Sequence, residues 1–278
     1  MEAREFQERL RRTGAYDTPA SPRRARCDRL LGRLDAWYYY HLLRIVVDCA
    51  RVSRRGLLDA ASWSVFSFRA LRLVEAVGGR VSVAGFRRAA AVPSPVVYVA
   101  NHMSLLETFA IPVMAMARGR HLTIVLKESL LRYPYFGRVL AAIRPVTVSR
   151  RNPREDLKRV LEGTTASLAN GDDVLIFPQS TRTTQVDAAD FNSLASKVAR
   201  RAGVPLVPLA LKTDFHGIGR VVRDVGPVDR SRPVLFRFGD PIRITGTGQQ
   251  EHRRVVAFIV ETLREWRDSG ATRAAAGT

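Results

Sequence analysis

From residue 81 onward, short apolar runs alternate with segments of helical periodicity. The runs are rich in β-branched residues and lie at 81–86, 95–100, 122–126, 143–149, 173–177, 204–212 and 233–238. Apolar residues recur at helical spacing in 105–118, 154–170, 190–202 and 250–267. This alternation predicts an α/β fold with a mixed, largely parallel sheet flanked by helices. We expect this domain to span 81–268 and residues 269–278 to form a disordered tail.

Before residue 81 the pattern is helical. Two helices are predicted, at 28–53 and 56–78, and they carry a group of aromatic residues: Trp37, Tyr38, Tyr39, Tyr40, Trp63 and Phe66. Two interpretations remain open. The pair, residues 28–80, is either an amphipathic element that docks on a membrane or a cover for the core of the main domain. The polar, arginine-rich residues 1–27 are predicted to be a mobile arm.

The net charge changes the picture of possible partners. The chain of 278 residues carries a formal charge of +19, and 41 of its 45 basic residues are arginine. Residues 61–160 hold 16 basic and only 5 acidic side chains. Such a field attracts anions, which include phospholipid headgroups, nucleic acids and phosphorylated substrates. A solvated, arginine-rich surface without a partner is the alternative.

Cysteine content and hydropathy restrict the location. The two cysteines, Cys27 and Cys49, form no C-x-x-C pair, which favours a reducing compartment and argues against a disulfide framework or zinc site. The charged N-terminus has no apolar centre typical of a secretory signal. The longest run without charge, 89–106, is interrupted by two prolines, so no membrane-spanning helix is expected. Any membrane contact would be peripheral.

A histidine and a carboxylate follow the apolar run that ends at residue 100. On one continuous helix, His102 and Glu107 would point about 140° apart, so they can meet only if His102 lies in a loop and Glu107 in the first helical turn. Ser104 and Glu107 have the S-x-x-E spacing of a capping box. Glu107 either caps the helix only, or also orients the imidazole as a general base.

Other polar groups follow other predicted strands. The segment after 173–177 presents four polar side chains, Gln179, Ser180, Thr181 and Arg182. An arginine at the end of a strand suits phosphate binding, although an ordinary surface arginine is the simpler interpretation. Two of only four lysines, Lys127 and Lys212, end two further strands. No G-x-S-x-G elbow, Walker A loop or H-E-x-x-H motif occurs.

Taken in order, four blocks of this chain resemble the 1-acylglycerol-3-phosphate acyltransferase family within the glycerolipid acyltransferases. That family carries N-H-x4-D, K-x-E-[LS]-x-x-x-P-x-x-G, F-P-E-G-T-R-S and V-P-[IV]-x-P-V. The matching residues here are Asn101, His102 and Glu107; Lys127-Glu128-Ser129 with Pro134 and Gly137; Phe177 through Thr183; and Val204 through Pro208. The resemblance covers about residues 60 to 240.

The resemblance implies an acyltransferase fold with a helical membrane-docking element before it. It implies transfer of an acyl chain from acyl-CoA or acyl carrier protein to the hydroxyl of a lysophospholipid, and we expect 1-acylglycerol 3-phosphate to be converted to phosphatidic acid. His102 would be the general base and Glu107 its orienting carboxylate. The expected substrate-binding residues are Asn101, Ser104, Lys127, Gly137, Gln179, Ser180, Thr181, Arg182 and Lys212. No metal and no cofactor beyond the acyl donor is implied, and the protein would lie on the cytoplasmic face of the cell membrane.

Three departures from the family pattern leave the acceptor open. The family aspartate is Glu107, and the glutamate and glycine of the third block are Gln179 and Ser180. The acceptor is therefore lysophosphatidic acid, another lysophospholipid that is remodelled, or a lyso-ornithine lipid. The rival class is a catalytically inactive module that binds anionic lipid. Nucleic-acid binding is not expected, because the aromatic residues cluster in the two predicted helices instead of alternating with basic residues on a strand.

Overall fold

The computed structural model describes residues 1–19, 35–179, 181–219 and 222–275. Its centre is an eight-stranded sheet with the strand order β1-β2-β8-β7-β3-β6-β4-β5. The strands are β1 (Tyr16–Asp17), β2 (Val81–Ala84), β3 (Val97–Ala100), β4 (Leu122–Lys127), β5 (Val146–Val148), β6 (Asp173–Ile176), β7 (Leu206–Lys212) and β8 (Val234–Phe238). Only the β1–β2 and β7–β8 pairs of this sheet are antiparallel. The prediction of a mixed, largely parallel sheet is confirmed.

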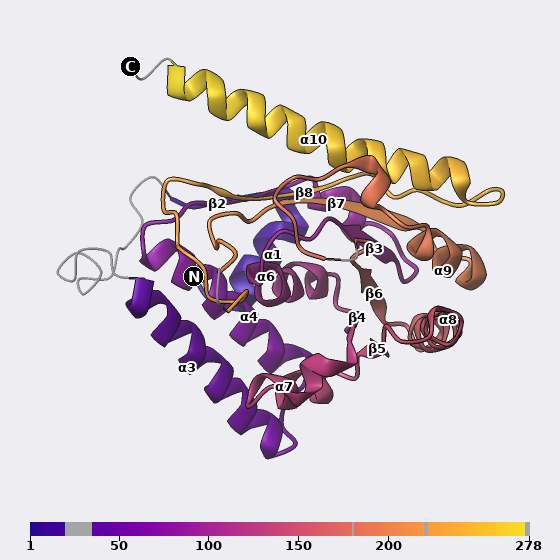
Figure 1. Ribbon diagram of the computed structural model, residues 1–278, viewed down its shortest axis with the longest axis horizontal. Helices are drawn as coiled ribbons and strands as arrows, with labels where there is room; N and C mark the ends of the chain where they lie inside the picture. The colour runs from indigo at the N-terminus through magenta and orange to yellow at the C-terminus, as the bar shows by residue number, and fades with distance from the viewer. Residues whose placement is uncertain (20–34, 180, 220–221, 276–278) are drawn as a thin grey trace.

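Helices cover both faces of the sheet, and the protein has the layered form of an α/β domain (Figure 1). The α-helices of the described residues are α1 (Ala3–Thr13), α3 (Asp35–Arg54), α4 (Ala60–Ala76), α5 (Phe86–Ala90), α6 (Leu106–Ala115), α7 (Phe136–Ala142), α8 (Pro153–Ala169), α9 (Leu194–Ala202) and α10 (Gln249–Ala275). Short 3-10 helices are η1 (Met116–Arg118), η2 (Glu128–Arg132) and η3 (Ala188–Asp190). One apolar cluster joins α1, α4 and α6 to the sheet, and a second joins α8, α9 and α10 to its other face.

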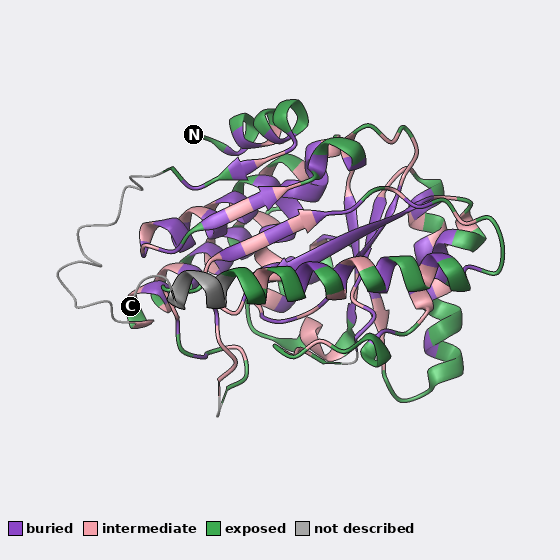
Figure 2. Cartoon of the chain, turned by 90° about the horizontal axis from the view of Figure 1, so that it is seen from above, coloured by how far each residue is buried: buried purple, intermediate pink, exposed green. Residues whose placement is uncertain are grey.

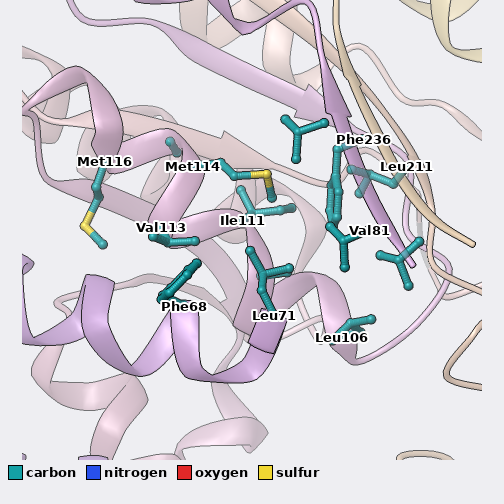
Figure 3. Close-up of a cluster of buried hydrophobic side chains, with 14 of the residues drawn as sticks. Phe68, Leu71, Val81, Leu106, Ile111, Val113, Met114, Met116, Leu211 and Phe236 are labelled. Carbon is teal, nitrogen blue, oxygen red and sulfur yellow. The ribbon is translucent and has the colours of Figure 1, made fainter. Parts of the chain in front are cut away.

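The packing of α4 and α6 against the sheet forms the larger core. Phe68 and Leu71 of α4 meet Ile111 of α6, and the side chains of β2, β7 and β8 close the cluster from the sheet side (Figure 3). These side chains are almost completely buried. Each large apolar side chain contributes about 1.5–3 kcal/mol when it leaves water. Helix α6 is therefore held firmly, and so is the loop that leads into it.

The order of the parallel strands brings four strand ends to one edge of the sheet. Strand β3 pairs in parallel with β6 on one side and with β7 on the other, and β6 pairs in parallel with β4. The segments that follow these strands carry the blocks identified in the sequence. The carboxyl ends of parallel strands are the usual location of ligand sites in α/β sheets.

The first residues of the chain correct the sequence-based expectation of a mobile arm. Residues 20–27 of the predicted arm lie outside the described residues. Residues 3–13, however, form α1, and Phe6 and Leu10 of this helix are completely buried. Gln7 donates to the carbonyl of Val113 at 3.0 Å, and Arg11 donates to that of Ala117 at 2.9 Å. Helix α1 thus packs against α6 and satisfies carbonyls at and beyond the end of that helix.

The aromatic helices also differ from expectation, because their aromatic residues divide between core and surface. Tyr38 and Trp63 are buried, whereas Tyr40 is 56% exposed. Val65 of α4 is 49% exposed, because α4 is buried by α3 on one side and α6 on the other. Of the two interpretations, cover for the core therefore holds for part of each helix. The last helix, α10, continues to Ala275, past the predicted start of the tail at 269. Up to residue 269 its outer face is exposed (Figure 2).

We predict that the replacement Leu10→Ala lowers the free energy of unfolding by about 2–5 kcal/mol, because it leaves a cavity beneath α1. Urea denaturation followed by circular dichroism measures this change. Glu8→Ala is the control, since Glu8 lies on the exposed face of the same helix. A mobile arm would give the same stability for both variants, and that result would contradict the packing of α1.

Candidate active site

The site begins at Asn101, which extends the pairing of β3 with β7 by its side chain. Its carboxamide nitrogen donates to the carbonyl of Leu211 at 2.8 Å, and its oxygen accepts from the amide of Leu211 at 2.8 Å. Asn101 is completely buried. It was predicted to bind substrate, but in this structure it joins the β3–α6 loop to β7. The side chain therefore fixes the start of the loop that carries His102.

His102 and Glu107 meet as their spacing allows. His102 lies in the loop, α6 begins at Leu106, and Glu107 is in its first turn. The imidazole Nδ1 and the Glu107 Oε2 are 2.5 Å apart. The histidine side chain is 23% exposed and the glutamate side chain is completely buried. The carboxylate thus holds the proton of the imidazole on Nδ1 and leaves Nε2 for chemistry.

The other oxygen of Glu107 is fixed by three donors. The amides of Met103 and Ser104 donate to Oε1 at 2.7 Å and 2.9 Å, and the hydroxyl of Thr213 donates to the same atom. The hydroxyl of Ser104 donates to Thr213 and accepts from the amide of Leu106 at 3.2 Å. The bond between the Glu107 side chain and the Ser104 amide, one of the two hydrogen bonds of the predicted capping box, is thus present. Ser104, which was predicted to bind substrate, is buried and positions the carboxylate.

Thr213 is a site residue that sequence reasoning did not assign. It directly follows β7 and is completely buried. Its hydroxyl links Ser104 to Glu107, two residues more than a hundred positions earlier in the chain. The available signal was its place directly after Lys212, at a predicted strand end on the same edge of the sheet.

The loop after β6 contacts His102 at its ring, its backbone amide and its backbone carbonyl. The ring of Phe177 stacks on the imidazole with centroids 4.4 Å apart and planes 28° apart. The Gln179 Oε1 accepts from the His102 amide at 2.6 Å, and the Thr183 amide donates to the His102 carbonyl at 3.0 Å. Gln179 is 5% exposed, so it anchors the histidine backbone in this structure. A neutral amide does this without adding a second carboxylate beside Glu107.

Of the three cations predicted to bind substrate, two are paired with a carboxylate and one is not. Arg182 forms an ion pair with Asp224 at 2.5 Å, and Lys212 forms one with Asp214 at 2.6 Å. Lys127 is exposed at the end of β4, and no carboxylate contacts it within the described part of the chain. Asp214 and Asp224 were not anticipated from the sequence, because nothing local to either residue indicates its partner.

The remaining predicted residues have diverse surroundings. Thr181 is exposed, and its hydroxyl accepts from Arg223 at 3.3 Å. Ser180 lies outside the described residues. Gly137 is buried in the first turn of α7, where a Cβ would fall 2.1 Å from the carbonyl oxygen of Leu131. The close approach of η2 therefore requires glycine at 137. Its contact with substrate stays a prediction.

The described side chains contain no group of three or more His, Cys, Asp or Glu residues arranged to bind a metal. What the arrangement provides is a single oriented imidazole, stacked on an aromatic ring and open on one nitrogen, with cations on the neighbouring loops. Such an imidazole can remove a proton from a hydroxyl group.

Comparisons with known proteins agree with this arrangement. Residues 81–212 match the family model described as Acyltransferase. The matched segment spans a little less than half of the chain. It contains His102 and Glu107, all four blocks through Pro208, and β7 with Lys212. It thus covers the edge of the sheet where the site lies.

Individual relatives have the same kind of name. A Pseudomonas aeruginosa 1-acyl-sn-glycerol-3-phosphate acyltransferase is 28% identical over 209 residues, which cover 73% of this chain and 76% of that protein. A Chlamydomonas reinhardtii 1-acyl-sn-glycerol-3-phosphate acyltransferase is 33% identical over 132 residues, which cover 48% of this chain and 38% of that protein. The chain thus spans about three quarters of the first relative and less than half of the second.

The fold also has a solved counterpart. The crystal structure of the 1-acyl-sn-glycerophosphate acyltransferase PlsC from Thermotoga maritima aligns with a TM-score of 0.64 over 83% of this chain and 94% of that chain. The sequence identity is 18%, so this likeness shows the fold alone.

We predict that Thr213→Val lowers the free energy of unfolding by about 1–3 kcal/mol, because it deprives the buried Glu107 carboxylate of a donor at nearly constant volume. Thr165→Val is the matched control, since the Thr165 hydroxyl is buried without a hydrogen-bond partner in the described structure. The control is expected to be neutral or slightly stabilising. Equal stability of the two variants in urea denaturation would contradict the role of Thr213.

Proposed function

We propose that this protein transfers an acyl chain from a thioester donor to the free hydroxyl of 1-acylglycerol 3-phosphate and so forms phosphatidic acid in phospholipid synthesis. The observation that carries the proposal is the hydrogen bond between His102 Nδ1 and the buried Glu107 carboxylate, inside the segment that matches the Acyltransferase family model. The relatives are named for 1-acyl-sn-glycerol-3-phosphate, which is lysophosphatidic acid, and these names support it as the acceptor. The donor is acyl-CoA or acyl carrier protein, and no further cofactor is needed.

The proposed reaction is a direct displacement in a ternary complex. The acceptor hydroxyl gives its proton to His102 Nε2 while its oxygen attacks the thioester carbonyl carbon. The C–S bond breaks, the thiolate leaves, and the imidazolium returns the proton to sulfur. The products are the ester and the free thiol, so atoms and charge balance. Glu107 stabilises the imidazolium that forms and keeps the ring in the required tautomer.

Phosphate recognition is proposed for the cations beside this centre. Arg182 lies in the loop that anchors His102, and its planar guanidinium can bind phosphate oxygens in pairs. Lys127 ends a neighbouring strand and is available to a second anionic group of acceptor or donor. The proposed division of roles leaves Asn101, Ser104 and Gln179 as positioning residues.

A place for the acyl chain is proposed between α3, α4, α6 and α7. An apolar cavity there is lined by Thr108 and Phe109, which directly follow Glu107, and by side chains of the other three helices, such as Phe66 and Leu140. Only Ser67 and Thr108 bring hydroxyl groups to its wall. An apolar lining beside the proposed reaction centre suits a hydrocarbon chain. The enclosed space is only about 30 Å³, so the four helices would have to separate to admit the chain.

We predict that His102→Ala lowers the turnover number by about 10²–10⁴-fold, because the general base is lost. The test is release of free thiol from a long-chain acyl-CoA, with mass spectrometry of the lipid product over a panel of lysophospholipids and a lyso-ornithine lipid. Glu107→Gln is expected to cause a smaller loss, since the imidazole remains but loses its charged partner. Unchanged turnover in His102→Ala, with the fold intact by circular dichroism, would contradict this mechanism.

A module that binds anionic lipid without catalysis is the second candidate, and the neutral Gln179 and the high charge favour it. It predicts binding of lysophosphatidic acid with no transfer from either kind of donor. Turnover by the wild-type protein distinguishes the two functions.

We propose that the protein works at a membrane surface through α3 and the turn that follows it. In the described ranges no helix combines the length and apolar character needed to cross a bilayer. The outward face of α3 carries Tyr40 and Leu43, each 56% exposed, and the exposed arginines Arg44, Arg51 and Arg54. Leu57 in the turn is 64% exposed. Apolar and basic side chains on one helical face suit the interface of an anionic bilayer.

The double replacement of Tyr40 and Leu43 by Glu is predicted to weaken binding to phosphatidylglycerol vesicles by about tenfold or more, because two apolar contacts are lost and two negative charges are added. Leu157→Glu is the control, since Leu157 is a partly exposed apolar residue of α8 outside this face. Co-sedimentation with vesicles measures the binding. Equal affinity of both variants would remove α3 from the proposal.

A further inference from the structure

We propose that Asp224 is a built-in competitor for the phosphate group of the acceptor, and that it sets how strongly Arg182 binds that group. The inference rests on the proposed function, because it concerns the same acceptor. Arg182 Nη2 and Asp224 Oδ1 are 2.5 Å apart, and their side chains are only 18% and 27% exposed. The arginine that is best placed to receive a phosphate therefore already holds a carboxylate when no substrate is bound.

The position of Asp224 is enforced by its surroundings. Its backbone carbonyl is 3.0 Å from His216 Nε2, and His216 is almost completely buried. Burial lowers the pKa of His216, so the neutral imidazole donates through Nε2 to this carbonyl. The hydroxyl of Tyr38 lies 3.2 Å from Nδ1 and can donate to it. Tyr39 donates to the carbonyl of Gly226, two residues beyond Asp224.

A second set of contacts fixes the far end of the same segment. Asp35, the first residue of α3, accepts from the amide of Val228 at 2.9 Å and pairs with Arg230 at 3.0 Å. The chain around Asp224 is thus attached to α3 through Asp35, Tyr38 and Tyr39. An ion pair between two mobile surface residues would not have such support. The backbone that carries Asp224 is held in place before any ligand arrives, and this keeps its carboxylate beside Arg182.

The charge of the ligand decides the outcome of the competition. A phosphate monoester carries nearly two negative charges at neutral pH and can use two guanidinium N–H groups at once. It can therefore displace the singly charged Asp224 carboxylate from the Arg182 guanidinium, or share the guanidinium with it. The phosphodiester of lysophosphatidylcholine carries one negative charge beside the positive charge of choline, and it competes less well. Asp224 thus favours a monoester over a diester while reducing the affinity for both.

The test measures Asp224→Asn, which removes the charge and keeps the shape. The KM for lysophosphatidic acid is expected to fall about five- to tenfold, the size expected for loss of one partly buried competing charge. The inhibition constant of phosphatidic acid should fall by a similar factor, because the product has the same headgroup. The KM for the acyl donor should not change. The KM for lysophosphatidylcholine should fall by a larger factor, so that selectivity for the monoester decreases.

Asp229→Asn is the matched control. Asp229 is bonded to Ser231 and Arg232, a few residues further along the chain, and does not contact Arg182. The KM values of the Asp229→Asn variant should therefore equal those of the wild type. In an Arg182→Ala background, Asp224→Asn should have no effect on the KM, because the guanidinium for which the carboxylate competes is absent.

The outcomes are distinguishable from those of the proposed function. Equilibrium binding of a short-chain lysophosphatidic acid below its micelle concentration is measured beside turnover. Absence of turnover in the wild type would contradict the proposed function alone. Tighter binding by Asp224→Asn than by wild type supports the competition even then. Unchanged or weaker binding by this variant, with Asp229→Asn like wild type, would overturn the competition and make Asp224 a residue that merely positions Arg182.

Discussion

The buried carboxylate of Glu107 is the constraint on which the site depends. A charge that has no contact with water is tolerated only when hydrogen bonds replace its hydration. Glu107 is completely buried and receives hydrogen bonds from Met103, Ser104, Thr213 and His102. Three of these donors come from the loop before α6, but Thr213 comes from the end of β7. The carboxylate can therefore be buried only when β3 and β7 lie side by side. The geometry of the histidine follows from the topology of the sheet.

Local geometry is what sequence reasoning predicted well. The spacing of His102 and Glu107 required a loop residue and a first-turn residue, and the structure has both. The strand ends at Lys127 and Lys212 were located to within a residue or two because apolar runs end abruptly there. In each case the signal lies within about ten positions of the residue.

Contacts between distant parts of the chain are what sequence reasoning missed. Phe6 and Leu10 have the spacing of a helical stripe, but the carbonyls that accept from α1 belong to residues more than a hundred positions later. The partner of Arg182 likewise depends on the path of the chain after β7. Gln179 was predicted to bind substrate because of its block, and the block gave no sign that its oxygen accepts from the backbone amide of His102. A motif indicates which residues gather, but the sheet decides which of them face one another.

Helix α3 connects the surface to the site through neighbouring residues. Successive residues of a helix point about 100° apart, so Tyr38, Tyr39 and Tyr40 face three directions. The first two reach His216 in the interior, and the third is exposed. Under the proposed function, the helix that contacts the bilayer also holds the segment that carries Asp224. The location of the lipid surface and the position of the competing carboxylate then depend on one rigid element.

The distribution of charge has a consequence for turnover in the proposed reaction. Acylation changes the glycerol hydroxyl and leaves the phosphate untouched, so phosphate contacts stabilise acceptor, transition state and product alike. Binding that is uniform along the reaction does not accelerate the chemical step, and in excess it slows the release of product. A chain with a net charge of +19 attracts anionic lipids without help from its site. Pairing Arg182 with Asp224 and Lys212 with Asp214 limits that attraction where the product must leave. The oriented imidazole, which acts only on the reacting hydroxyl, then remains the main source of catalysis.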